Sequence, residues 1–178
     1  MRNILAERRA HTMAELLVAS VVIVILFTAT LGAFVLTKNV YSGNIAAYNL
    51  QRDVDGLLAR ITRGIQEQGS SYGLRSGVSY TIPAASPASS RIDFKGVDDL
   101  TRSYFLSNNT VVYSSPTQSP AQQVIYTPPP SSTITLGFAN VSVDQQVVYI
   151  YIAVSQQIGN RTIVGSIATN VNLRNAPK

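Results

Sequence analysis

Few side chains in this sequence have the chemistry that enzymes use for acid–base, nucleophilic or metal-dependent steps. The chain contains one histidine, His11, and no cysteine. Catalysis by a cysteine–histidine pair is therefore excluded, and a serine–histidine–aspartate triad or a zinc site lacks most of its usual components. No glycine-rich loop of the kind that binds phosphate is present. We predict from these features that the protein is not an enzyme and binds no metal or cofactor.

One cluster of acidic residues stands out and consists of Asp93, Asp98 and Asp99. Carboxylate oxygens are the ligands that calcium prefers, but the spacing of these three residues matches no calcium-binding loop. We therefore interpret the cluster as an exposed turn, and a calcium site is the alternative interpretation.

The most unusual ionisable residue is Glu15, which directly precedes an uncharged apolar run from Leu16 to Leu36. As a helix rising 1.5 Å per residue, this run is long enough to cross a hydrocarbon core about 30 Å thick. A carboxylate carried to the centre of a bilayer costs about 2.5–3.5 kcal/mol. We therefore expect a role that requires Glu15 at this position. A favourable interaction with the N-terminal end of the helix dipole is the simplest such role.

The residues before the apolar run form a short basic leader, 1–10, which ends in the small residue Ala10 and is followed by H-T-M-A-E-L-L-V. This order resembles the N-terminus of type IV prepilins and type II secretion pseudopilins. The resemblance implies cleavage by a prepilin peptidase between Ala10 and His11, with methylation of the new N-terminus. Ala10 stands where the family usually has glycine, and His11 where it usually has phenylalanine or methionine. In the family, the residue that corresponds to Glu15 attracts the free α-amine of a neighbouring subunit during assembly.

The resemblance also implies a function, a location and a set of partners. It predicts a structural subunit, a minor pseudopilin or minor pilin, that assembles with other pilin or pseudopilin subunits. The subunit would be held in the inner membrane by a single span, with its C-terminal domain in the periplasm or outside the cell. The absence of the cysteine pair that many pilins carry favours the minor class.

Other interpretations of the N-terminus and of the function remain open at this stage. The apolar run could be a secretory signal peptide cut between Thr30 and Ala33, or the uncleaved anchor of a simple binding domain. A pilin that captures DNA for competence is a further alternative. The net charge of +5 would favour it, but the arginines are spread singly along the sequence rather than clustered. Nucleic acid is therefore a disfavoured partner.

A single long helix is predicted to carry the apolar run and its continuation. No proline occurs before Pro83, and apolar residues recur at three- and four-residue spacing from Val54 to Ile65. We predict a helix over residues 11–68, with Gly69 as its stop. The predicted organisation is a basic leader (1–10), a membrane and assembly helix (11–37), an amphipathic continuation (38–68) and a globular β-rich domain (69–178).

After Gly69 the hydrophobic period changes from that of a helix to that of a strand. Two alternating segments on either side of Gly159 and Asn160 predict one β-hairpin, and a second is predicted around Asn108 and Asn109. A slip in the alternation near Ala139 and Asn140 predicts a β-bulge. The predicted fold class is α+β, with the amphipathic half of the helix packed on an antiparallel sheet, as the pilin resemblance also implies.

Overall fold

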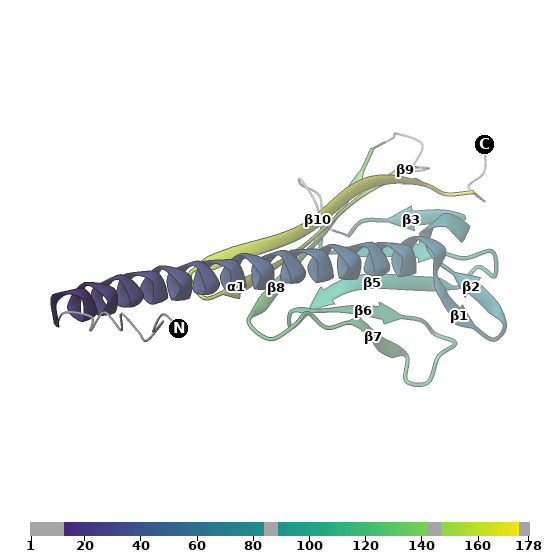
Figure 1. Cartoon of the computed structure of the whole chain (residues 1–178). Coiled ribbons are helices and arrows are strands. Elements are labelled where there is room, and N and C mark those ends of the chain that lie inside the picture. The colour runs from purple at the N-terminus through teal and green to yellow at the C-terminus, as the bar shows by residue number, and fades with distance from the viewer. Residues whose placement is uncertain (1–12, 84–88, 142–146, 175–178) are drawn as a thin grey trace, which may run out of the picture. The chain divides into compact units, whose positions relative to one another are not determined.

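The computed structural model describes residues 13–83, 89–141 and 147–174, and Figure 1 shows the order of its elements. One long helix, α1 (Met13–Arg63), precedes the strands, and neighbouring strands pair antiparallel, so the fold is α+β as predicted. The chain divides into two compact units, Met1–Ser42 and Gly43–Lys178, and α1 contributes to both. The remaining elements are β1 (Ile65–Glu67), β2 (Ser70–Tyr72), the one-turn 3-10 helix η1 (Leu74–Ser76), β3 (Ser79–Thr81), β4 (Arg91–Lys95), β5 (Thr101–Ser107), β6 (Thr110–Ser114), β7 (Gln122–Tyr126), β8 (Ser132–Asn140), β9 (Val147–Ile158) and β10 (Arg161–Asn172).

The C-terminal part of α1 buries the apolar stripe that the sequence predicts. Leu50, Val54, Leu57 and Ile61 recur every three or four residues and are at most 2% exposed. This spacing places them on one side of the helix, against the globular unit. Each fully buried aliphatic side chain contributes about 1.5–3 kcal/mol, so this stripe fixes the helix to the sheets.

The helix ends at Arg63, five residues before the predicted end at Gln68. Gly64 has a φ of +100° and donates its N–H to the carbonyl oxygen of Arg60 at 2.9 Å, which closes the last turn. The chain then reverses as the short hairpin β1–β2, in which Gln68 and Gly69 form the turn. Gly69 is therefore a hairpin residue and not the helix stop. The prediction was wrong because Ile65 continues the apolar spacing of the helix.

The strands from β3 to β7 form a five-stranded antiparallel sheet in sequence order. Asn108 and Asn109 connect β5 to β6 with φ values of 47° and 59°, which confirms the hairpin predicted there. Two residues with positive φ give the turn whose twist matches that of paired strands. The pairing of β6 with β7 contains a register shift between Val111 and Val112.

The strands β8, β9 and β10 form a separate three-stranded sheet in the order β10–β9–β8. The β9–β10 hairpin turns at Gly159 and Asn160 as predicted, and its pairing is continuous from Arg161 to Asn172. Along β9, four alternating side chains are completely buried: Val148, Ile150, Ile152 and Val154. The β-domain therefore contains two large sheets, where the sequence predicts one.

The β-bulge predicted near Ala139 and Asn140 is absent from the described residues. Strand β8 pairs with β9 without a register shift as far as Asn140, which faces Val148. The alternation slips because the strand ends at Asn140, and Val141, which is 52% exposed, begins the connection to β9.

Two close contacts join these parts into one core. Ser89 exchanges two main-chain hydrogen bonds with Phe138 of β8, at 3.0 and 2.8 Å, just before the start of β4 in the other large sheet. Gly165 of β10 lies so close to α1 that a Cβ atom there would be 2.8 Å from the carbonyl carbon of Leu50. A residue without a side chain is therefore required where the strand meets the helix.

Candidate functional site

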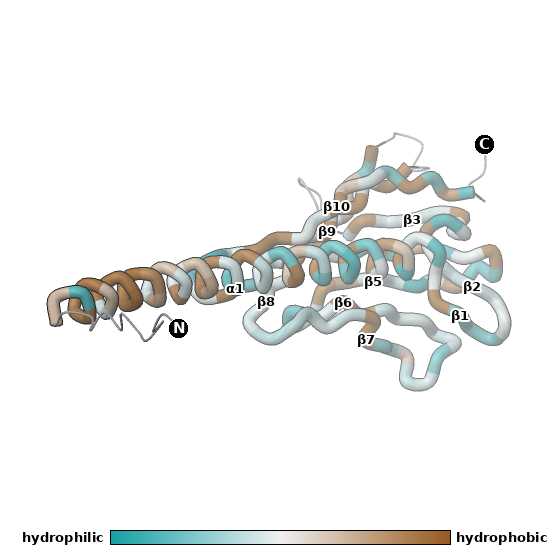
Figure 2. Tube along the Cα trace, viewed as in Figure 1, coloured by the Kyte–Doolittle hydropathy of each residue, from teal (hydrophilic) through white to brown (hydrophobic). Residues whose placement is uncertain are grey.

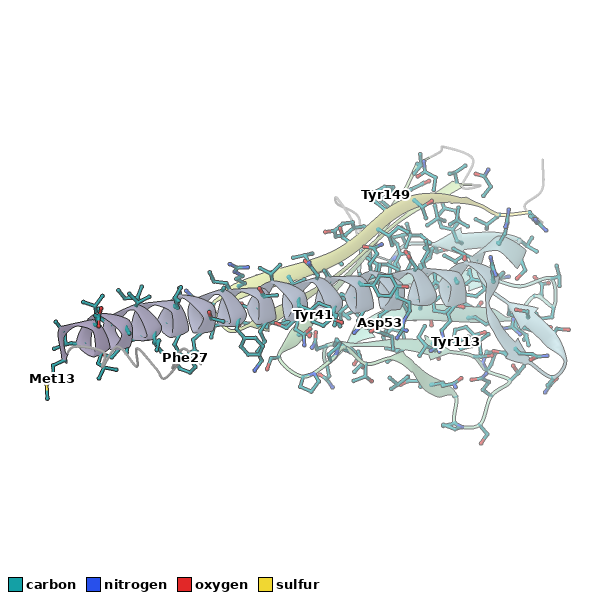
Figure 3. The ribbon with its side chains drawn as sticks, viewed as in Figure 1. Met13, Phe27, Tyr41, Asp53, Tyr113 and Tyr149 are labelled. Atoms are coloured by element: carbon teal, nitrogen blue, oxygen red, sulfur yellow. The ribbon has the colours of Figure 1, made fainter. Side chains whose placement is uncertain are left out.

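The N-terminal part of α1 exposes an apolar surface on all its sides. Every residue from 13 to 42 is exposed, including Phe27 at 64% and Phe34 at 66%. Figure 2 shows the hydrophobic colouring along this part of the helix, and Figure 3 shows side chains projecting all around it. Within the described part of the chain, α1 is the one helix whose length and composition suit a membrane span. An exposed apolar surface of this extent marks a membrane or protein interaction site.

The serine and threonine hydroxyl groups in this part of the helix bond to the helix itself. Thr28, Thr30 and Thr37 each donate a hydrogen bond of 2.8 Å to the main-chain carbonyl oxygen four residues earlier. Ser20 donates at 2.8 Å to the carbonyl oxygen of Leu17. Because each hydroxyl has a partner within the helix, these residues need no water and are suited to an apolar environment.

Of the residues that the pilin resemblance singles out, Glu15 is described and lies in the first turn of α1. A carboxylate in the first turn interacts favourably with the helix dipole. Ala10 and His11 lie outside the described residues. Cleavage between them, and the role of Glu15 in assembly, therefore stay predictions.

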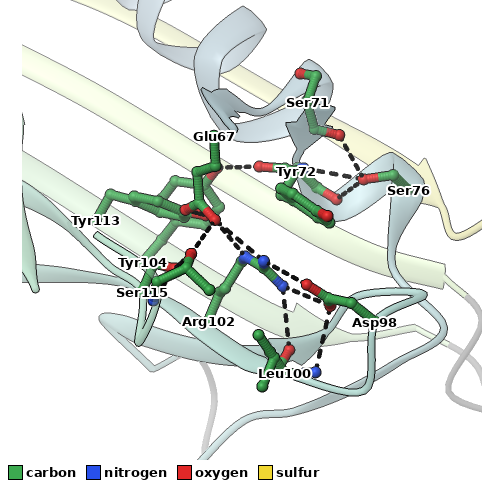
Figure 4. Close-up of polar contacts among 12 residues, drawn as sticks. Glu67, Ser71, Tyr72, Ser76, Asp98, Leu100, Arg102, Tyr104, Tyr113 and Ser115 are labelled. Atoms are coloured by element: carbon green, nitrogen blue, oxygen red, sulfur yellow. Dashed lines mark hydrogen bonds and ion pairs between the residues drawn. The ribbon is translucent and has the colours of Figure 1, made fainter. Parts of the chain in front are cut away.

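A second candidate site, which the sequence analysis missed, is a buried cluster of charged groups around Arg102 (Figure 4). Arg102 belongs to β5, and its fully buried side chain lies between two carboxylates. The Nη2 atom of Arg102 is 3.0 Å from Oε2 of Glu67, at the end of β1, and 2.7 Å from Oδ2 of Asp98. On its other side, the guanidinium lies 3.6 Å from the ring centre of Tyr72, a cation–π contact.

The carboxylate of Glu67 is 2% exposed and accepts two further hydrogen bonds from hydroxyl groups. Tyr113 donates to Oε1 at 2.6 Å, and Thr117 donates to Oε2 at 2.7 Å. Both carboxylate oxygens therefore have partners, as a buried charge requires. These bonds tie the β1–β2 hairpin to β5, to β6 and to the loop after β6.

The surroundings of the two acids lower their pKa values. Burial would raise the pKa of Glu67, but the hydrogen bonds from Tyr113, Thr117 and Arg102 outweigh it and hold the pKa below its ordinary value. For Asp98, chiefly the hydrogen bonds from Arg102 lower the pKa to about 2. Both acids are therefore ionised near neutral pH. Neither is suited to take up or release a proton in that range, and their bonds join three separate elements of the fold.

The acidic cluster of the sequence analysis is thus only partly an exposed turn. Asp99 is 94% exposed, as predicted, and lies 3.7 Å from Lys95, whereas Asp98 is turned towards Arg102. Asp93 pairs with Arg91 at 2.8 Å. The three carboxylates therefore face three different cations. Within residues 13–83, 89–141 and 147–174, no group of acidic or histidine side chains is arranged to hold a metal ion.

In comparisons with known proteins, no family model matches the chain, and no curated protein or solved structure is significantly similar to it.

Proposed function

We propose that this protein is a structural subunit, a minor pseudopilin or minor pilin, of a type II secretion or type IV pilus assembly. The observation that carries the proposal is the exposed apolar surface of α1 over residues 13–42, with Glu15 in its first turn. Such a surface must be covered by lipid or by the helices of other subunits. In a subunit that is first stored in the inner membrane and later assembled through its helix, lipid covers this surface before assembly and the helices of other subunits cover it afterwards.

The order of residues at the N-terminus supports the same proposal. Cleavage after Ala10 would create a positively charged α-amine at His11, four residues before Glu15. In an apolar environment, a carboxylate is stabilised by a nearby cation. The pair formed by the α-amine of one subunit and Glu15 of its neighbour would therefore favour assembly over isolated subunits.

Three arginines of the globular unit give little support to the alternative of a DNA-capturing pilin. Arg102 is buried between two carboxylates, and Arg91 pairs with Asp93. Arg60 donates a hydrogen bond to the carbonyl oxygen of Ile125. These three guanidinium groups already have partners within the fold, whereas binding to DNA phosphates requires cations on one exposed face.

The proposal is tested by co-expressing the full chain with a prepilin peptidase and determining the intact mass and the N-terminal sequence. Loss of residues 1–10, with His11 as the new and methylated first residue, is the expected result. An intact leader would contradict the proposal in favour of a simple membrane anchor. A cut near Ala33 would identify the apolar run as a signal peptide and release a β-domain without its membrane helix.

A further inference from the structure

The strand β10 is the longest edge strand among the described residues. It spans Arg161–Asn172 and pairs with β9 on one side, with no other strand beside it in the sheet. Its pairing contains no register shift, and its sequence contains no proline and no lysine. Prolines, lysines and bulges are the features by which proteins protect an edge strand from pairing with another chain.

The other edges of the two large sheets are shorter or covered. The edge strand β3 has three residues. The edge strand β7 has five residues, its pairing with β6 contains a register shift, and Arg60 of α1 bonds to its Ile125. The edge strand β8 is held through Phe138 by the main chain of Ser89. Among the described edge strands, β10 is thus the longest, and its main chain is held from outside the sheet only at its end, where the N–H of Arg174 bonds to Arg75.

A groove of about 480 Å³ follows the last part of this edge. Leu58 and Thr62 of α1 form one wall, and residues 169–172 of β10 form the other. The groove is lined by residues from both faces of β10, since Val171 is buried and Asn172 is exposed. Because side chains on opposite faces of a strand line it, we infer that the groove lies beside the edge of β10.

Two arginines lie at one end of the groove, Arg75 of η1 and Arg174 just after β10. The N–H of Arg174 donates to the carbonyl oxygen of Arg75 at 3.0 Å, so the two residues are held side by side. Both are exposed, and the lining of the groove contains no carboxylate. Within the described residues, neither guanidinium forms a salt bridge.

We propose that this groove binds an extended segment of a partner polypeptide, which pairs with the edge of β10 as a fourth strand and places a carboxylate at Arg75 and Arg174. Strand addition satisfies the unpaired main-chain groups of an edge. The guanidinium groups of two arginines that line one groove can bind a carboxylate with charge-assisted hydrogen bonds. A paired strand advances one residue for each residue of β10, so about four residues of the segment pair beside residues 169–172, and the residues after them reach Arg75 and Arg174. This site goes beyond the proposed function, because it belongs to the globular unit and does not depend on Glu15 or on leader cleavage.

The test measures binding of a fluorescein-labelled heptapeptide to the purified full chain in detergent micelles by fluorescence anisotropy. The peptide alternates threonine and valine and ends in two aspartates. One control peptide has asparagines in place of the aspartates, and a second is N-methylated at alternate residues, which removes main-chain donors. We expect saturable binding of the acidic peptide and at least tenfold weaker binding of both controls. Equal binding of all three peptides, or no saturation, would overturn the proposal.

Variants of the protein locate the site. The double variant Arg75→Gln/Arg174→Gln should bind the acidic peptide at least tenfold more weakly. The matched control is Arg161→Gln, an exposed arginine at the opposite end of β10, which should bind within twofold of the unchanged protein. Equal losses in both variants would show attraction by net charge only and would contradict the proposal.

Hydrogen exchange then distinguishes strand addition from the binding of a small anion. The bound peptide should slow exchange of the main-chain amides of residues 169–172, with no change in β7. Displacement of the peptide by free succinate at the same concentration would identify an anion site without strand pairing, and would also overturn the proposal.

Discussion

Arg102 donates two hydrogen bonds, from Nε and Nη2, to a single oxygen atom, Oε2 of Glu67, at 3.1 and 3.0 Å. The two residues are separated by 35 positions in the sequence, and their side chains are at most 2% exposed. Glu67 belongs to the short hairpin that follows α1, and Arg102 to the central strand of the five-stranded sheet. The pair therefore fixes where the chain leaves the helix relative to the sheet on which the helix packs.

Replacing Arg102 with leucine should destabilise the globular unit by about 3–5 kcal/mol, because it leaves Glu67 buried without its cation. The free energy of unfolding of the full chain in detergent, followed by tyrosine fluorescence in urea, measures the change. Arg91→Leu is the matched control: its side chain is 51% exposed, and its ion pair with Asp93 should be worth about 0–1 kcal/mol. Similar losses in the two variants would show that the buried cluster has no special role in stability.

The stability of the globular unit should depend on pH through the ionisation of Asp98. Its pKa is about 2 in the folded state, below the ordinary value of 3.8, so the unfolded state binds the proton first as the pH falls. The stabilisation is fully present above about pH 4 and is lost as the pH falls from about 4 to 2, by about 2 kcal/mol. Glu67, whose pKa is also lowered, adds a loss of the same sign. Unfolding curves measured between pH 5 and 2 provide the test.

The variant Asp98→Asn separates this effect from general acid denaturation. It should be less stable than the unchanged protein at pH 5, and the difference should shrink towards pH 2, where Asp98 itself becomes protonated. A difference that stays constant over this range would show that ionisation of Asp98 does not contribute.

Gly165→Ala should destabilise the globular unit by about 1–3 kcal/mol, because its Cβ atom would lie 2.8 Å from the carbonyl carbon of Leu50 and 2.9 Å from the nitrogen of Gln51. Gly56→Ala is the matched control in the same unit. A Cβ atom there has nothing within 4 Å, and alanine favours a helix interior by about 1 kcal/mol over glycine. The midpoint of thermal unfolding should therefore fall for Gly165→Ala and rise for Gly56→Ala. A rise for Gly165→Ala would contradict the close approach of strand and helix.

Glu15→Ala tests the proposed assembly role in cells that contain the other subunits. The variant should remain in the membrane, because the apolar run is unchanged, but its incorporation into the fibre should fall at least tenfold. Membrane fractionation and purification of sheared fibres measure the two quantities separately. Glu15→Asp keeps the charge and should retain more incorporation than alanine. Normal incorporation of the alanine variant would remove the proposed role of the carboxylate.

The parts of the fold that follow from local patterns could be predicted from the sequence. The alternation of Val148 to Val154 and the turn at Gly159 specify the β9–β10 hairpin without reference to the rest of the chain. The end of the helix was missed because the spacing from Ile61 to Ile65 continues the helical pattern, although Gly64 between them ends the helix. The positive φ of Gly64 therefore ends the helix although the hydrophobic spacing continues beyond it.

The buried ion cluster could not be predicted because its members come from elements far apart in the sequence. Glu67 follows the helix, Asp98 precedes β5, and Tyr113 lies on β6. The local signal was the spacing of four residues between Asp98 and Arg102, two opposite charges. Nothing in the sequence pairs either residue with Glu67. For the proposed assembly role, the sequence pattern singled out Glu15 before the apolar run, and the structure has Glu15 in the first turn of α1.

The internal hydrogen bonds of Ser20, Thr28, Thr30 and Thr37 make these four hydroxyl groups independent of what surrounds the exposed helix. A helix with hydroxyls bonded to lipid headgroups or to a neighbouring subunit would have to break those bonds when it changed environment. This helix can exchange hydrocarbon chains for the apolar side chains of other helices without losing any of these four bonds. If the proposed function holds, the same helix conformation therefore serves both in a bilayer and in the interior of a fibre.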